Sequence, residues 1–129
     1  MRNKELLLID LCARLPYGVI CQFVWTYSNE TTDGESVIAK GDDNIKCINI
    51  HTKEIQADYY DEWVDLKYCK PYLRPMSSMT EEEREELAHY DNDVQRTDFF
   101  YSHHIDCRYM IEKGLALEAP EGMYNIKDK

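Results

Sequence analysis

Residues 18–27 read GVICQFVWTY, a stretch whose apolar side chains fall at every second position. A period of two is typical of a β-strand, because successive side chains point to opposite faces of a sheet. Ile20 and Val24 make the second face partly apolar, so the pattern predicts a central strand covered on both sides. The positions that share the first face are Val19, Cys21, Phe23, Trp25 and Tyr27.

The segment before this strand has a different period. Apolar residues recur there at spacings of three and four, which predicts an amphipathic helix over residues 1–15. Asn3 is a candidate N-cap, and Pro16 and Gly18 end the helix. The apolar stripe, which we expect to pack on the sheet, consists of Leu7, Leu8, Leu11, Cys12 and Leu15.

Several short strands follow the central one. SVIAK (36–40) and IKCINI (45–50) flank GDDN, which is typical of a hairpin turn, and WVDLKYC (63–69) alternates again. We therefore predict antiparallel strands across residues 17–69, as a small twisted sheet or a partly open barrel. Two prolines in KPYLRPM (70–76) then predict an extended, non-helical crossing.

Two C-terminal helices complete the predicted fold. Thr80 and Glu83 have the spacing of a capping box, which predicts a helix over residues 80–90. A second helix is predicted over residues 97–113, stopped by Gly114 and followed by a tail over residues 115–129. The predicted fold class is α+β in a single domain, residues 1–129: an N-terminal helix on the small antiparallel sheet or barrel, followed by two C-terminal helices.

The composition indicates a soluble globular protein, with 43% hydrophobic and 31% charged residues. Five cysteines are spread along the chain without a CxxC pair, as expected of reduced, buried thiols. The apolar run near the N-terminus is interrupted by Asp10 and Arg14, which argues against a signal peptide. No stretch approaches the roughly 20 apolar residues of a membrane span. We expect a cytoplasmic protein with no membrane association.

The net charge of −10 is concentrated in residues 58–98, which hold 12 acidic and 5 basic residues. No basic stripe offsets this excess, so direct binding to nucleic acid is not expected. An acidic segment fits either a solvated face or a surface that docks on a basic protein partner. One special form of the second interpretation is nucleic-acid mimicry, in which ordered carboxylates occupy a site that otherwise binds phosphates.

Residues 102–107 read SHHIDC and carry the residue types of a metal site. On a helix His103 and Cys107, four residues apart, could bind one zinc ion, although zinc needs one or two further ligands. The same pair could form a cysteine–histidine nucleophile, but no Gly-rich turn beside Cys107 predicts an oxyanion hole. Phenylalanine, methionine and isoleucine share that helical side and favour a third interpretation, core packing. We therefore expect no metal, no cofactor and no catalytic residue.

Aromatic residues supply the candidates for a small-ligand site. A pocket for a nucleotide or sugar at the mouth of the sheet or barrel is one interpretation of Trp25, Tyr59, Tyr60 and Trp63. Carboxylates interleaved with these tyrosines could support acid–base chemistry, but a charged strand edge is the favoured interpretation. The chain has no phosphate-binding loop, GxGxxG or GxSxG motif.

Three blocks of the sequence resemble an uncharacterised family of small proteins from gut Bacteroidetes and their phages. The blocks are LLIDLCARLPYGV (7–19), KPYLRPMSSMTEEE (70–83) and IEKGLALEAPEGMY (111–124), about a third of the chain. The resemblance implies a phage, mobile-element or intestinal bacterial context and assigns no catalytic residue. The sequence favours a non-enzymatic accessory protein that engages a macromolecular partner through an acidic, tyrosine-rich surface. The alternative is a small-ligand binding protein or enzyme.

Overall fold

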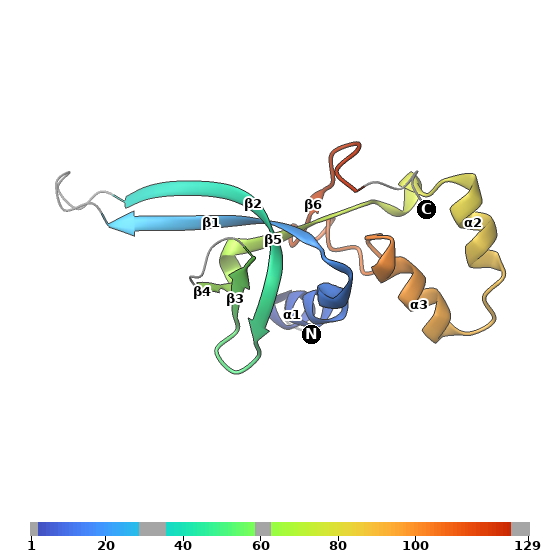
Figure 1. Ribbon diagram of the computed structural model, residues 1–129, viewed down its shortest axis with the longest axis horizontal. Helices are drawn as coiled ribbons and strands as arrows, with labels where there is room; N and C mark the ends of the chain where they lie inside the picture. The colour runs from blue at the N-terminus through green and yellow to red at the C-terminus, as the bar shows by residue number, and fades with distance from the viewer. Residues whose placement is uncertain (1–2, 29–35, 59–62, 125–129) are drawn as a thin grey trace.

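A computed structural model describes residues 3–28, 36–58 and 63–124, with side chains outside residues 25–28 and 36–40. Its α+β fold consists of an N-terminal helix on an open, mixed six-stranded sheet, followed by two helices (Figure 1). The helices are α1 (Asn3–Arg14), α2 (Glu81–Ala88) and α3 (Asp93–Ser102). The strands are β1 (Ile20–Ser28), β2 (Ser36–Asn49), β3 (Glu54–Ala57), β4 (Trp63–Asp65), β5 (Cys69–Leu73) and β6 (Leu117–Glu118), in the spatial order β4-β3-β2-β1-β5-β6.

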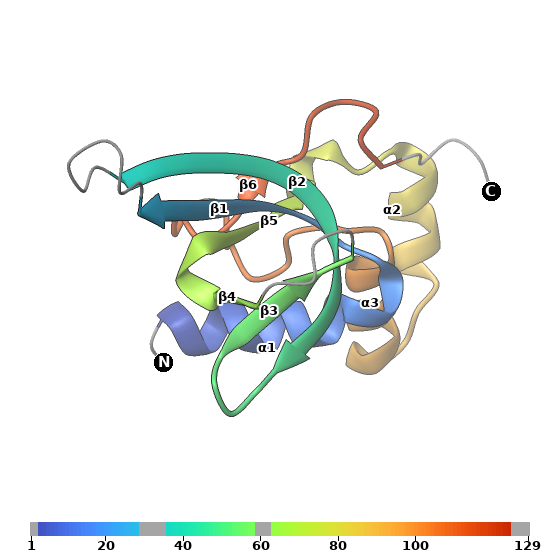
Figure 2. The ribbon, with the colours of Figure 1, turned by 60° about the vertical axis from the view of Figure 1, so that its left-hand side comes forward.

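The central strand and the first helix are where the two periodic patterns predict them. β1 lies between β2 and β5, and its Val19–Phe23 end contributes fully buried side chains at Cys21 and Phe23. The opposite face, with Ile20 and Val24, is half-buried. α1 lies across one face of the sheet, so that Leu7 and Leu11 join the same apolar core (Figure 2). Burial of the alternating and helical stripes against each other positions the rest of the chain.

The predicted hairpin turn at GDDN is wrong, because β2 continues through it. β1 pairs with β2 residue by residue, and the ladder includes Phe23 opposite Gly41 and Ile20 opposite Asn44. The turn-forming residues therefore use their backbone groups in the sheet, where the long partner strand outweighs their local preference. An irregularity between Ile45 and Cys47 then marks the point at which β2 passes from β1 to β3.

The predicted α+β fold and the antiparallel strands over residues 17–69 are confirmed, because β1 pairs with β2, β2 with β3 and β3 with β4 antiparallel. The pair of β5 with β6, which was not predicted, is parallel and makes the sheet mixed. The predicted extended crossing is a strand that pairs antiparallel with β1 and parallel with β6. β6 also corrects the prediction of a structureless tail over residues 115–129, since Leu117 and Glu118 pair with Tyr72 and Leu73. The sheet is open, and its described edge strands are β4 and β6.

The second of the two C-terminal helices differs most from its prediction. α2 has the predicted capping box: Thr80 accepts a hydrogen bond from the Glu83 amide, and the Glu83 carboxylate accepts one from the Thr80 amide. The helix predicted over residues 97–113 instead begins at Asp93, capped by the Asn92 side chain, and ends at Ser102. His104 has a φ of 61°, which the helix cannot continue through.

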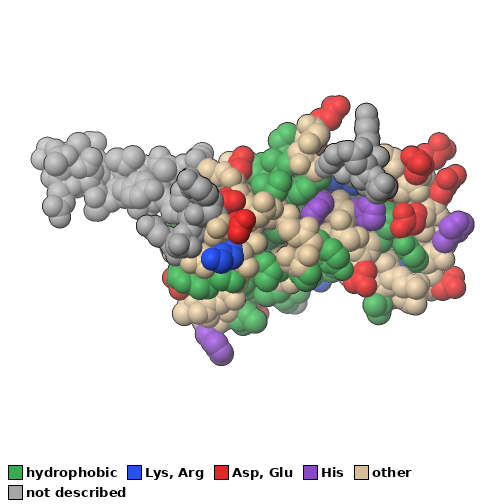
Figure 3. Space-filling view, in the orientation of Figure 1, with side chains coloured by type: hydrophobic (Ala, Val, Ile, Leu, Met, Phe, Trp, Pro, Cys, Tyr) green, Lys and Arg blue, Asp and Glu red, His purple; other side chains and the backbone are tan. Residues whose placement is uncertain are grey.

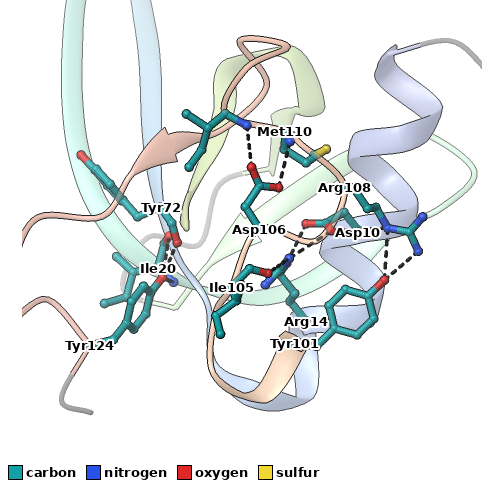
Figure 4. A network of polar contacts seen from close by, with 11 residues as sticks. Asp10, Arg14, Ile20, Tyr72, Tyr101, Ile105, Asp106, Arg108, Met110 and Tyr124 are labelled. Atoms are coloured by element: carbon teal, nitrogen blue, oxygen red, sulfur yellow. Dashed lines mark hydrogen bonds and ion pairs between the residues drawn. The ribbon is translucent and has the colours of Figure 1, made fainter. Parts of the chain in front are cut away.

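Tyr124 completes the ladder between β1 and β5. The antiparallel register of β1 and β5, continued by one pair beyond Cys21 and Pro71, would place Ile20 opposite Tyr72. At this position the Tyr124 hydroxyl lies between the two backbones and bonds to both. The Ile20 amide donates to the Tyr124 hydroxyl at 3.0 Å, and that hydroxyl donates to the Tyr72 carbonyl at 2.8 Å (Figure 4). Burial raises the pKa of Tyr124, so the hydroxyl keeps its proton at neutral pH.

The first prediction concerns this bridge. Tyr124→Phe keeps the ring but leaves the Ile20 amide and the Tyr72 carbonyl without their hydroxyl partner. We expect the free energy of unfolding in urea to fall by about 1–3 kcal/mol. Amide hydrogen exchange at Ile20 should also accelerate more than exchange in the middle of β1. Tyr109→Phe, at a tyrosine that is 58% exposed, is the matched control. Equal stability of the two variants would contradict a structural role for the hydroxyl.

Candidate functional site

The side chains of the SHHIDC segment do not converge. His103 caps α3, and its ring stacks on Phe99 at a centroid distance of 4.1 Å, with Nδ1 2.9 Å from the Phe99 carbonyl. Because the helix ends before His103, the four-residue spacing to Cys107 no longer places both on one helical face. Both side chains are half-buried, which corrects the prediction that they fill the core. Within the described residues, no group of three or more His, Cys, Asp or Glu side chains is arranged to hold a metal ion.

The backbone of this segment binds two buried arginines. Arg14 donates to the Ile105 carbonyl at 2.7 Å, and Arg74 donates to the His103 carbonyl at 3.2 Å. The main chain of Arg74 adds two further bonds, to the His104 carbonyl at 2.7 Å and from the Asp106 amide at 2.8 Å. These bonds hold residues 103–106 beside the end of β5 and explain why the chain leaves the helix there.

Arg14 is fully buried with Asp10, one turn earlier on α1. Its Nε lies 2.7 Å from one carboxylate oxygen, and its Nη2 lies 3.3 Å from the other (Figure 4). The guanidinium lies 4.9 Å from the centre of the Tyr101 ring, a cation–π contact. Arg108 donates to the Tyr101 hydroxyl and approaches Asp10 at 3.6 Å. The cluster ties α1 to α3, and its contacts are structural.

Arg74 forms the second buried pair. Its two terminal nitrogens donate to the Glu83 carboxylate at 2.9 and 2.7 Å, a bidentate arrangement. These hydrogen bonds hold the pKa of Glu83 at about 2, so the carboxylate stays ionised despite its burial. Because Glu83 also closes the capping box of α2, one carboxylate joins the start of α2 to the end of β5.

His104 and Tyr124 form a stacked pair with a ring-centroid distance of 3.8 Å. Among the described residues the His104 Nδ1 is buried without a hydrogen-bond partner. Burial, with Arg14, His103 and Arg74 nearby, lowers the pKa of His104 to about 4. The imidazole is therefore neutral at physiological pH and packs as an aromatic ring.

A groove lies where α3 and the end of α2 meet the turn after α1. It has a volume of about 340 Å³ and is called the α2–α3 groove below. Its lining combines aromatic rings with carboxylates and contains neither lysine nor arginine. Tyr90 donates to Glu86 at 2.7 Å across its wall. The residues that matter for its chemistry are Tyr17, Glu86, Tyr90, Asp98, Phe99 and His103.

Acidic side chains gather at the end of the molecule formed by α2 and α3 (Figure 3). Arg84 and Arg96 are the two basic residues of these helices. The exposed acidic residues of the two helices and their connection are Glu81, Glu82, Glu85, Glu86, Asp91, Asp93 and Asp98. The exposed acids of α2, α3 and their connection therefore lie at one end of the molecule, and two of them, Glu86 and Asp98, line the aromatic groove.

The sequence candidates for a ligand pocket are only partly described. Trp63 lies on β4 and is 44% exposed, and it lines neither the α2–α3 groove nor the other described pockets. Tyr59 and Tyr60, and the side chain of Trp25, lie outside the described residues. Tyr17 was not among the candidates, because no local pattern places a residue after α1 next to α2 and α3. In the sequence, the feature that could have marked Tyr17 as a candidate is its position directly after Pro16, where the predicted helix ends.

Comparisons with models of protein families, with curated proteins and with solved structures found no match to this chain. Across residues 3–28, 36–58 and 63–124, every helix is too short or too polar to cross a membrane.

The second prediction tests the Asp10–Arg14 pair. Arg14→Met leaves the Asp10 carboxylate buried without its main partner, and we expect it to lower the free energy of unfolding by about 3–5 kcal/mol. Asp10→Leu combined with Arg14→Met removes both charges. The double variant should lose at least about 1 kcal/mol less than the sum of the two single variants. Strict additivity in urea denaturation would show that the two side chains do not stabilise each other.

The third prediction concerns pH. The unfolded chain binds a proton at His104 near its ordinary pKa of 6.5, whereas the folded protein binds it only at about 4. The unfolded state is therefore favoured progressively as pH falls from 6.5 to 4, and stability is fully present above that window. His104→Phe keeps an aromatic ring and removes this titration. As pH falls from 6.5 to 4, the free energy of unfolding of His104→Phe should rise by about 1–2 kcal/mol relative to that of the wild type. The expected change is kept this small because the His104 ring is only partly buried and solvent screens its charge. A pH-independent difference would contradict this.

Proposed function

We propose that this protein is a non-enzymatic accessory binding protein whose α2–α3 groove docks a basic segment of another protein. The observation that carries the proposal is the pairing of aromatic rings with carboxylates in a groove whose lining contains neither lysine nor arginine. The phage or mobile-element context that the sequence resemblance implies is consistent with an accessory role, and belongs to the same proposal.

The chemistry of the groove favours a lysine or arginine side chain. Glu86 and Asp98 offer acceptors for the planar fork of a guanidinium, and Tyr17 and Tyr90 offer ring faces for a cation–π contact. Tyr17 is 40% exposed, so a ring face is open to a partner. Arginine fits both kinds of contact at once, because its guanidinium stacks on rings while it bonds carboxylates in its plane.

The surrounding charge favours a protein partner with a basic surface. Two carboxylates line the groove, and five further exposed acidic residues lie on the same two helices and their connection, so that together they attract such a partner and accelerate encounter. The same charges repel nucleic-acid phosphates. A basic nucleic-acid-binding protein is one partner that satisfies both conditions, which is the mimicry form of the proposal.

The fourth prediction measures binding to the groove directly. A fluorescein-labelled arginine-rich peptide is titrated with the protein at about 0.15 M salt, with a glutamate-rich peptide of the same length as the negative probe. We expect saturable binding of the arginine-rich peptide alone, read by fluorescence anisotropy. Glu86→Lys combined with Asp98→Lys should weaken it at least about tenfold, because attraction becomes repulsion inside the groove.

The matched control reverses one aspartate and one glutamate elsewhere. Asp58→Lys combined with Glu112→Lys changes the net charge by the same amount at exposed positions outside the groove. It should weaken peptide binding by less than about threefold, because at 0.15 M salt the interaction with charges more than about 8 Å away is largely screened. An equal loss of peptide affinity in both double variants would show that binding depends on the net charge of the protein and not on the groove. Displacement of duplex DNA from a basic DNA-binding domain then tests mimicry separately.

A further inference from the structure

A second pocket lies away from the acidic surface, where α1 approaches the start of β5 and the turn at Gly114. Its volume is about 280 Å³, and it is called the lysine-rimmed pocket below. It shares no lining residue with the α2–α3 groove. Any ligand it holds is therefore independent of the partner proposed above.

The floor of the lysine-rimmed pocket is apolar. Leu7, Leu66 and Cys69 belong to the core and are at most 4% exposed, and Leu115 packs against them half-buried. Burial raises the pKa of Cys21, and its hydrogen bond with Cys69 raises it further, so a neutral Cys21 thiol lies behind the floor. A floor of this kind favours a hydrocarbon or aromatic body over a polar one.

Three lysines stand at the rim of this apolar floor. Lys4, Lys67 and Lys70 are all exposed, and together they are three of the nine lysines in a chain whose net charge is −10. Asp65 offsets part of this charge, since its carboxylate lies 3.5 Å from the Lys4 ammonium. The Lys67 ammonium lies 5.1 Å from the centre of the Tyr68 ring. The rim keeps a positive excess in a protein that is negative elsewhere.

We infer that the lysine-rimmed pocket binds a small carboxylate with an apolar body, such as a medium-chain fatty acid. The apolar floor takes the body, and the lysine ammonium groups bind the carboxylate at the mouth. The volume lies just below the range of roughly 300–1,000 Å³ that is usual for small-molecule sites. A pocket of this volume fits a short acyl chain or a single ring.

The test uses three probes that separate the two halves of the ligand. Octanoate carries both the apolar chain and the carboxylate, 1-octanol carries the chain alone, and acetate carries the charge alone. Each is titrated into the ¹⁵N-labelled protein while amide chemical shifts are followed. We expect saturable shifts with octanoate, confined to residues around 4–7, 66–70 and 114–115, and at least about tenfold weaker binding of both other probes.

Variants then test the rim without disturbing the core. Lys67→Glu combined with Lys70→Glu reverses two exposed charges and should weaken octanoate binding at least about tenfold. Lys46→Glu combined with Lys53→Glu makes the same change in net charge outside the pocket and should leave the affinity within about twofold. The spectrum of each unliganded variant shows whether it is folded.

Four results would overturn the inference. Absence of saturable octanoate shifts, or shifts centred on the α2–α3 groove, would show that the pocket holds no such ligand. Octanol binding as tightly as octanoate, or no effect of the rim variant, would show that the lysines only keep the apolar surface soluble. Loss of peptide binding in the α2–α3 groove leaves this result unchanged, so the two proposals fail separately.

Discussion

The fold depends on two buried guanidinium groups that must find hydrogen-bond acceptors away from water. A buried charge is costly unless it is paired with an opposite charge and hydrogen-bonded. In the described part of the chain Arg14 meets this requirement with Nε and Nη2, while its Nη1 is buried without a hydrogen-bond partner. Arg14 and Arg74 each use one carboxylate, Asp10 or Glu83, and each then binds a carbonyl in residues 103–105. Those carbonyls are free to accept because α3 has ended at Ser102. Burial of the two arginines therefore depends on the end of α3 at Ser102, which leaves these carbonyls available as acceptors.

This constraint positions the acidic surface. Glu83 joins the first turn of α2 to Arg74 at the end of β5, while the Arg74 guanidinium and main chain also hold the segment that follows α3. Both helices that build the α2–α3 groove are thus anchored to the same residue of the sheet. A groove anchored at two points keeps its carboxylates and rings in fixed positions, which lowers the entropy lost when a partner binds.

Local patterns in the sequence predicted local structure well, and contacts between distant segments account for the errors. The alternation in residues 18–27 and the stripe from Leu7 to Leu11 specify β1 and α1, and Thr80 with Glu83 specifies the start of α2. The continuation of β2 and the early end of α3 depend on partners dozens of residues away. One signal was present: Asp10 and Arg14 continue the spacing of Leu7 and Leu11, so an ion pair lies within the apolar stripe of α1. A charged pair at such positions indicates a buried network.

The acidic residues of α2 and α3 fall into two groups: those that the helix dipole stabilises, and those that it does not. Glu81, Glu82 and Glu83 lie in the first turn of α2 and Asp93 in the first turn of α3, where the helix dipole stabilises negative charge. Glu86 and Asp98 lie beyond the first turns, and Glu86 is near the C-terminal end of its helix, where the dipole disfavours it. These are the two carboxylates that line the α2–α3 groove. A cation bound in the groove would give these two carboxylates an opposite charge that the helix dipoles do not supply, which is the physical reason to propose a basic side chain there.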